Sequence, residues 1–206
     1  MKLYSSIGPN PRLVRLFLAE KGVELPIEEV DIIAGANRHS AFLALNPGGT
    51  TPVLELDGGQ CIAETTAICE YLEERFPQSP LIGASAEERA LARMWWRRVD
   101  LQVVQPMTVG FRAAEGLDLF KDRVRCYPAV ADEFKAAARE GLVWLDRQLG
   151  EQPFVCGERL TVVDLLLLSF LDFGGQVGQG LDGERCPNLA RWLDGMSTRE
   201  SARNTR

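Results

Sequence analysis

The sequence predicts an α/β domain followed by an all-helical domain. Strand and helix signals alternate over residues 1–76. Residues 77–85 are rich in proline, glycine and serine, a composition typical of linkers. Beyond this stretch, apolar residues recur at helical spacing and no strand signal follows. We therefore place a first domain at residues 1–78, a linker at 79–86 and a helical domain at 87–206.

The first domain is expected to open with a strand at residues 2–4 and a helix at 11–21. Gly22 ends this helix, because glycine readily adopts the left-handed conformation of a helix C-cap. A second strand at residues 25–32 follows. The remaining elements are expected to be a short helix, two strands joined at Asp57-Gly58-Gly59, and a helix from Glu64 to Phe76. This order of elements resembles that of thioredoxin-like domains.

The second domain is expected to contain helices alone. The first would run from Glu87 to about Glu115 with a kink at Pro106, because a proline inside a helix removes one hydrogen bond. Thr161 and Asp164 have the spacing of a capping box, so we assign Asp164 to folding rather than to catalysis. Further helices are expected at about 120–149, 162–177 and 188–199.

The composition argues against several classes of function. The chain has 206 residues and a net charge of −6, and it lacks the clustered lysines and arginines that nucleic acids or anionic membranes require. Its longest apolar stretch, residues 165–173, is too short to span a membrane, and no secretory signal is visible. Five scattered cysteines without CxxC spacing are typical of reduced thiols in a cytoplasmic protein. With His39 as the single histidine, no metal site is expected.

Two neighbouring segments predict a binding site built largely from backbone. Pro52 stands at the head of an apolar run, so the backbone of Thr51 stays free to pair with an extended ligand. Glu64 and Thr65 open a helical pattern, where a hydroxyl and free N–H groups can bind a carboxylate. This pattern favours a small peptide-like acid as the ligand. A simple hairpin followed by a capped helix is the alternative interpretation.

Three short motifs occur together in this chain. They are Thr51-Pro52-Val53, Glu64-Thr65-Thr66-Ala67-Ile68 and Thr161-Val162-Val163-Asp164. With these motifs the chain resembles cytosolic glutathione transferases over nearly its whole length. In that family a thioredoxin-like domain, with a cis-proline opening its third strand, precedes an all-helical domain. Two further segments, Pro9-Asn10-Pro11-Arg12 and Ala19-Glu20-Lys21-Gly22, are most similar to a fungal and bacterial subgroup of the theta-like branch.

The resemblance implies that glutathione binds along the first domain. The cysteinyl backbone of glutathione would pair with Thr51, beside Pro52 and Val53. Thr65 would hold the γ-glutamyl carboxylate, and Glu64 would take the ammonium group. Glutathione would act as a co-substrate with no other cofactor, and the enzyme would be a homodimer.

In this family a basic residue after the second strand usually meets the glycine carboxylate of glutathione. That position points to Arg38, with His39 as the neighbour that could take its place. A loop arginine can equally be an ordinary solvated charge. The role of Arg38 therefore stays open at this point.

Catalysis requires a group that stabilises the thiolate of glutathione, because the thiolate is the reactive form. The loop between the first strand and the first helix offers Asn10, Ser5 and Ser6 as hydrogen-bond donors. Asn10 is the first choice, since it stands where beta-class relatives carry a cysteine and nu-class relatives an asparagine. Its alternative role is an N-cap of the helix. The loop contains no cysteine, which excludes a mixed disulfide with glutathione there.

Three functions remain open on the sequence alone. The first is a detoxifying transferase that conjugates the glutathione thiolate to small hydrophobic electrophiles, whose site the helical domain would form. The second is a glutathione-dependent disulfide or peroxide reductase, which the asparagine shared with the nu class would favour. The third is a non-catalytic protein that keeps the fold in order to bind a partner.

Overall fold

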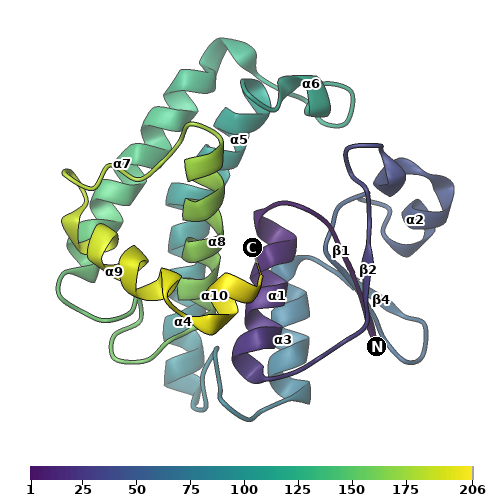
Figure 1. The fold of residues 1–206 in the computed structure, drawn as a ribbon, viewed down its shortest axis with the longest axis horizontal. Helices are drawn as coiled ribbons and strands as arrows, with labels where there is room; N and C mark the ends of the chain where they lie inside the picture. Colours follow the sequence, from purple (N-terminus) through teal and green to yellow (C-terminus); the bar gives the residue numbers. More distant parts are fainter. Residues whose placement is uncertain (206) are drawn as a thin grey trace. The chain divides into compact units, whose positions relative to one another are not determined.

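The computed structural model of the chain describes residues 1–205. By its internal contacts the chain divides into two compact units. The first contains residues 1–82 together with the C-terminal residues from Arg199, and the second runs from Gly83 to Thr198. One unit combines strands and helices, and the other is built from helices (Figure 1). The predicted fold class is confirmed.

A four-stranded sheet forms the centre of the first unit, with the strand order β2-β1-β3-β4. Strand β1 (Lys2–Ser5) runs parallel to β2 (Ile27–Glu29) and antiparallel to β3 (Val53–Glu55). Strand β4 (Cys61–Ala63) completes the sheet as the antiparallel partner of β3. Because Val53 pairs with Ala63, the residues that precede β3 lie close to those that follow β4.

Helices cover both faces of this sheet. Helices α1 (Pro9–Lys21) and α3 (Thr65–Arg75) pack against each other on one side of the strands, and α2 (Ser40–Leu45) lies on the other (Figure 1). A 3₁₀ turn at Ala36–Arg38 leads into α2. Gly22 adopts the left-handed conformation directly after α1, as the sequence predicts.

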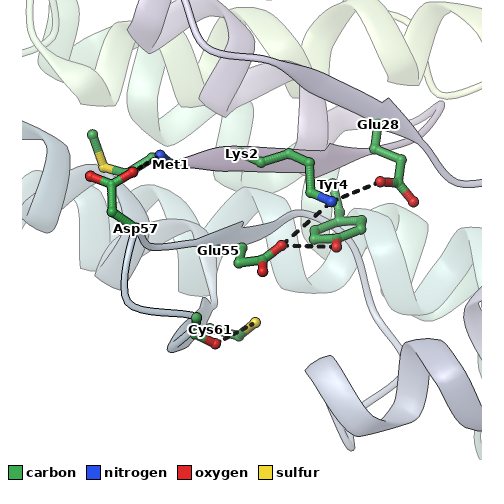
Figure 2. A network of polar contacts seen from close by, with 8 residues as sticks. Met1, Lys2, Tyr4, Glu28, Glu55, Asp57 and Cys61 are labelled. Carbon is green, nitrogen blue, oxygen red and sulfur yellow. Dashed lines mark hydrogen bonds and ion pairs between the residues drawn. The ribbon is translucent and has the colours of Figure 1, made fainter.

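Tyr4 belongs to the packing of the α2 face. Its ring meets that of Phe42 edge to face, with ring centroids 6.2 Å apart. Its hydroxyl donates to Glu55 at 2.9 Å, while the Lys2 ammonium lies over the ring and pairs with Glu28 at 2.9 Å (Figure 2). The hydrogen bond from Lys2 lowers the pKa of Tyr4, but burial and Glu55 outweigh it and raise the pKa above its ordinary value. These contacts tie the neighbouring strands together.

A buried ion pair joins the C-terminal ends of α1 and α3. The Lys21 ammonium lies 2.7 Å from the Glu73 carboxylate, and the two side chains are 0% and 1% exposed. Lys21 also donates to the carbonyl oxygen of Phe76 at 2.8 Å. Glu73 accepts the N–H groups of Leu81 and Ile82 at 3.2 and 2.8 Å. The pair therefore holds the chain that leaves α3 against the first unit.

The C-terminal residues differ from the predicted division of the chain. Although the sequence places them in the helical domain, the short helix α10 (Glu200–Asn204) contacts α1. Arg199 donates two hydrogen bonds of 2.8 Å to the Glu20 carboxylate, and the Ser201 hydroxyl donates to the same group. These charge-assisted bonds group the segment with the first unit.

The second unit is built around helix α8 (Val162–Gln176), which is apolar on nearly all sides. Thr161 and Asp164 form the predicted capping box at its start. The buried Asp164 carboxylate accepts the N–H of Thr161 at 2.9 Å and the indole N–H of Trp192 at 3.1 Å, which confirms its role in folding. Within residues 1–205 no helix is long and apolar enough to cross a membrane. The helices of this unit are α4 (Ala86–Val99), α5 (Gln105–Ala113), α6 (Leu117–Phe120), α7 (Ala131–Leu149), α8 (Val162–Gln176) and α9 (Pro187–Ser197).

The long helix predicted from Glu87 is interrupted ahead of Pro106, not at it. A π-helical segment, Asp100–Val104, separates α4 from α5. Pro106 has no N–H to donate to the Gln102 carbonyl, so the regular hydrogen-bond ladder fails at that point. A Cβ atom on Gly141 of α7 would collide with that carbonyl, which shows how closely α7 packs there.

The single helix predicted at 120–149 is wrong in its first third. Residues 121–130 lie between α6 and α7 and contain turns and a 3₁₀ segment at Pro128–Val130. Pro128 fixes its own backbone and disfavours the helical conformation at Tyr127. Helices α8 and α9 agree with the ranges expected from the sequence.

Candidate active site

The turn before β3 has the backbone that the sequence predicts for a ligand-pairing segment. The peptide bond between Thr51 and Pro52 is cis, and Pro52 is buried directly ahead of Val53. Within residues 1–205, no other backbone group hydrogen-bonds the N–H or the carbonyl oxygen of Thr51. An extended ligand could therefore pair with Thr51 as an additional strand would.

Two buried asparagines hold this turn in place, and the sequence analysis missed both. Asn46 donates to the carbonyl oxygen of Thr50 at 2.9 Å and accepts the N–H of Gly48 at 3.0 Å. Asn37 donates to the carbonyl oxygen of Gly49 at 2.7 Å. The Asn-Pro-Gly-Gly composition at residues 46–49 is a turn signal that could have indicated Asn46. No local pattern points to Asn37, which is twelve residues from its partner.

Arg38 lies beside the same turn. Its guanidinium covers Gly49 so closely that a Cβ atom there would collide with it. One guanidinium nitrogen is 3.5 Å from the carbonyl oxygen of Gly48, at the outer limit of a hydrogen bond. His39 is the exposed N-cap residue of α2. The structure thus brings Arg38 to the proline turn and leaves its charge open to a ligand.

Glu64 has an unusual backbone at the start of α3. Its φ of 70° and ψ of 125° lie in a region that costs a residue with a side chain on the order of 1–3 kcal/mol. Its exposed carboxylate forms no hydrogen bond or ion pair with the described residues. Thr65 is the first residue of α3, where backbone N–H groups and the helix dipole favour an anion. Because β4 pairs with β3, this pair lies next to the turn at Thr51.

Ser5 and Ser6 are buried and bonded inside the unit. Ser5 is 0% exposed, and its hydroxyl accepts a hydrogen bond of 2.6 Å from Arg15. Ser6 is 2% exposed, and its hydroxyl oxygen lies 2.6 Å from that of Thr51. Neither hydroxyl is open to a ligand thiol in this arrangement. Ser5 instead connects the end of β1 to α1, and Ser6 connects the β1–α1 loop to the turn at Thr51.

Asn10 differs from the two serines in its exposure and in its hydrogen bonding. It is half-buried, and its side chain forms no hydrogen bond with the described residues. The N-cap of α1 is Gly8, so the alternative role of Asn10 as an N-cap is wrong. Pro9 and Pro11 lack N–H groups, which leaves Asn10 as the main donor at this end of α1. Among the three predicted donors, Asn10 is the one whose side chain is not already bonded within the described residues.

The described residues contain no group of three or more histidine, cysteine or acidic side chains placed to hold a metal ion. The arrangement within the first unit is therefore one of hydrogen-bond donors and fixed charges. Thr51 offers backbone, Thr65 a helix start, Glu64 a carboxylate and Arg38 a guanidinium. Such a set is suited to a small peptide that carries both acid and amine groups.

Comparison with known proteins supports this interpretation. The N-terminal domain model of glutathione S-transferases matches residues 7–75, and the C-terminal domain model matches residues 126–200. Glutathione S-transferase 2 of Saccharomyces cerevisiae is 31% identical over 203 residues, which are 95% of this chain and 84% of that protein. Maleylacetoacetate isomerase of Pseudomonas aeruginosa is 31% identical over 197 residues, which are 94% of this chain and 90% of that protein.

A solved structure gives the same result at the level of the fold. The crystal structure of a glutathione S-transferase domain-containing protein from Marinobacter aquaeolei VT8 matches with a TM-score of 0.91 and 35% identity. The match covers 98% of this chain and 100% of that one. Relatives from a fungus and from bacteria agree with the subgroup that the sequence resembles. The chain therefore belongs to the glutathione S-transferase family.

Proposed function

We propose that this glutathione transferase binds glutathione along the proline turn and adds its thiolate to small hydrophobic electrophiles. One observation carries the proposal: the backbone of Thr51 and the carboxylate of Glu64, both without a partner among residues 1–205, lie next to each other and to the helix start at Thr65. Glutathione has a peptide backbone, an ammonium group and carboxylates that match these groups in kind. Glutathione would be the co-substrate, and no other cofactor is required.

Each end of glutathione has a proposed partner. The cysteinyl backbone pairs with Thr51, where the cis peptide at Pro52 leads into Val53 and the sheet. The γ-glutamyl carboxylate binds the Thr65 hydroxyl and the free N–H groups of α3, and Glu64 binds the ammonium group. The glycine carboxylate binds Arg38, with His39 beside it.

Asn10 is the proposed donor to the thiolate. Its amide N–H stabilises the negative sulfur, which lowers the pKa of the thiol from about 8.5. A decrease of about 2 units corresponds to about 2.7 kcal/mol of preferential stabilisation of the charged form. One good charge-assisted hydrogen bond and the N-terminal end of α1 can supply that amount. The thiol proton passes to water.

The transfer step needs no electron acceptor or metal. The thiolate donates its electron pair to an electrophilic carbon, and a carbon–sulfur bond forms. A leaving group such as chloride departs with its bonding electrons, or an activated alkene takes up a proton from water. Ser5 and Ser6 then have a positioning role, because both hydroxyls are already bonded inside the unit.

We further propose that the protein works as a homodimer in the cytoplasm. Leu91 and Met94 on α4 and Leu101 after it are 40%, 38% and 51% exposed, which gives the helical unit apolar surface for a partner. All five cysteines are free thiols, as in a reducing compartment. Light scattering on the purified protein measures the molar mass, and a single-chain mass would contradict the dimer.

An ultraviolet titration of the thiolate in the glutathione complex tests the mechanism. We expect a lowered thiol pKa in the wild type, and a return toward the value of free glutathione in Asn10→Ala. Thr65→Ala should weaken glutathione binding but keep the lowered pKa at saturation. Glutathione binding with an ordinary thiol pKa in the wild type would instead identify a binding protein without transferase chemistry.

A product assay separates conjugation from reduction. With a chlorinated nitroaromatic substrate, conjugation releases one chloride for each thioether formed. A reductase would instead convert a disulfide or peroxide and produce oxidised glutathione. Rapid reduction without thioether formation would contradict the proposed transfer.

A further inference from the structure

Arg15 reaches from α1 to Ser5 and Ser6, at the point where β1 ends and the β1–α1 loop begins. One of its guanidinium nitrogens donates to the Ser5 hydroxyl at 2.6 Å and to the carbonyl oxygen of Ser6 at 3.1 Å. One side chain thus holds the last residue of β1 and the first residue of the β1–α1 loop. The sequence analysis gave Arg15 no role, because nothing in the helical pattern distinguishes it from a surface arginine.

The contacts of Arg15 continue to the proline turn. The carbonyl oxygen of Ser5 accepts the N–H of Val30 at 2.7 Å, so Ser5 is fixed by both its backbone and its side chain. The Ser6 hydroxyl oxygen lies 2.6 Å from the Thr51 hydroxyl oxygen. Arg15, Ser5, Ser6 and Thr51 therefore form one chain of hydrogen bonds between α1 and the backbone proposed to bind glutathione.

The Arg15 guanidinium carries a positive charge next to this loop. Burial lowers the pKa of the guanidinium, the carboxylate of Glu29 raises it, and the neighbouring Arg12 lowers it. A guanidinium nevertheless remains protonated at neutral pH. Arginine suits this position because its fixed planar head can donate to two acceptors in a defined geometry. The charge and the geometry both act on the β1–α1 loop.

We propose that Arg15 is a positioning residue that links α1, the helix that carries Asn10, through Ser6 to the turn at Thr51, so that Asn10 is held at the distance needed to bond the glutathione sulfur. This inference rests on the proposed function. Arg15 touches no part of glutathione itself, and it acts through Ser5 and Ser6. Its loss should therefore affect the thiol more than the other groups of glutathione.

The test compares thiol chemistry with binding in Arg15→Met. The thiol pKa in the glutathione complex should rise by about one unit, which leaves about tenfold less thiolate at a pH below the pKa. The deficit in kcat/KM for the electrophile, measured at saturating glutathione, should then disappear at a pH well above the shifted thiol pKa. The Kd of S-methylglutathione, which has no thiol to ionise, should change less than about threefold.

Three further variants distinguish a positioning role of Arg15 from a general effect on the stability of the protein. Arg15→Lys keeps the charge but lacks the planar guanidinium with its two donors. The thiol pKa of this variant should therefore lie between those of the wild type and Arg15→Met. Ser5→Ala removes one acceptor without removing the buried charge, and it should raise the thiol pKa in the same direction. Arg75→Met is the matched control, because Arg75 is an exposed arginine on α3 that makes no hydrogen bond with the described residues. It should leave the thiol pKa unchanged.

Each outcome has one meaning. An unchanged thiol pKa in a folded Arg15→Met, or a kcat/KM deficit that is the same at every pH, would overturn the positioning role while the proposed function stands. If Arg15→Met does not fold, an unchanged thiol pKa in Ser5→Ala overturns the role instead. A wild type that fails to bind S-methylglutathione, or binds glutathione with an ordinary thiol pKa, overturns the proposed function and this inference together.

Discussion

Glu64, the proposed partner of the glutathione ammonium group, adopts a backbone conformation that lowers stability. Its positive φ is costly for any residue with a Cβ atom but not for glycine. We therefore expect Glu64→Gly to raise the free energy of unfolding by about 1 kcal/mol, since the relieved strain exceeds the cost of glycine's extra freedom in the unfolded chain. The same variant should bind glutathione more weakly, because the carboxylate is gone. Urea denaturation and a glutathione titration measure the two effects.

Glu64→Ala is the matched control for this prediction. It removes the same carboxylate but retains the Cβ atom and hence the backbone strain. Binding should weaken as in the glycine variant, while the gain in stability should be absent. Equal unfolding free energies for the two variants would show that the strain at Glu64 does not exceed the entropic cost of glycine.

The candidate site could be predicted where its signal is local in the sequence. Thr51 and Thr65 stand in short motifs whose turn and helix-start chemistry can be read directly. Arg15 and Asn37 could not be found in this way, because their partners lie nine to twelve residues away and depend on how the elements pack. Ser5 was a reasonable donor by residue type, but its burial became visible only in the fold.

At the scale of the elements, the pair of Lys21 and Glu73 joins two helices and the chain that follows them. Both charges are buried, so removing one leaves the other without compensation. We expect Lys21→Met to lower the free energy of unfolding by about 3 kcal/mol or more. The double variant Lys21→Met/Glu73→Gln should recover part of this loss, because a neutral amide oxygen can still accept an N–H group of Leu81 or Ile82.

Urea denaturation of the single and double variants, with constant slope, measures this coupling. The exposed variant Arg75→Met serves again as a control and should change stability by less than about 0.5 kcal/mol. If the double variant were less stable than Lys21→Met alone, the uncompensated charge would not be the cause of the loss.

The elements themselves were predictable where their apolar spacing is regular. Helix α8 has eleven buried residues and a complete capping box, and both were visible in the sequence. The π-helical segment was not, because it depends on the close approach of Gly141 to the Gln102 carbonyl as well as on Pro106. The break between α6 and α7 was missed because the polar residues before Pro128 fit a helical surface as well as a loop.

At the scale of the whole molecule, the division into an α/β and a helical part follows from the strand and helix patterns and the composition of the linker, but the place of the C-terminus does not. Helix α10 has five residues and a single buried apolar side chain, Ala202, so it has no periodicity to interpret. Its position depends on Glu20, which is 179 residues from Arg199 in the sequence. Only tertiary contacts could assign this segment to the first unit.

The contact between Glu20 and the C-terminal segment gives stability that depends on pH. Burial alone would raise the pKa of Glu20, but the hydrogen bonds from Arg199 and Ser201 outweigh it and hold the pKa below its ordinary value. A carboxyl group with a lower pKa in the folded state stabilises the fold above the unfolded pKa, about 4.3, and this contribution is lost as the pH falls through the folded pKa.

We therefore expect Glu20→Gln to lower the free energy of unfolding by about 1 kcal/mol at neutral pH, a modest value because solvent screens the half-buried pair. The difference from the wild type should shrink as the pH falls below about 4.3 and vanish below the folded pKa, where Glu20 is protonated in both states. Urea denaturation across this range measures it. Glu24→Gln, at an exposed glutamate with no hydrogen bond to the described residues, should match the wild type throughout. A Glu20→Gln deficit that does not shrink as the pH falls below about 4.3 would mean that packing, not the carboxylate charge, holds α10 on α1.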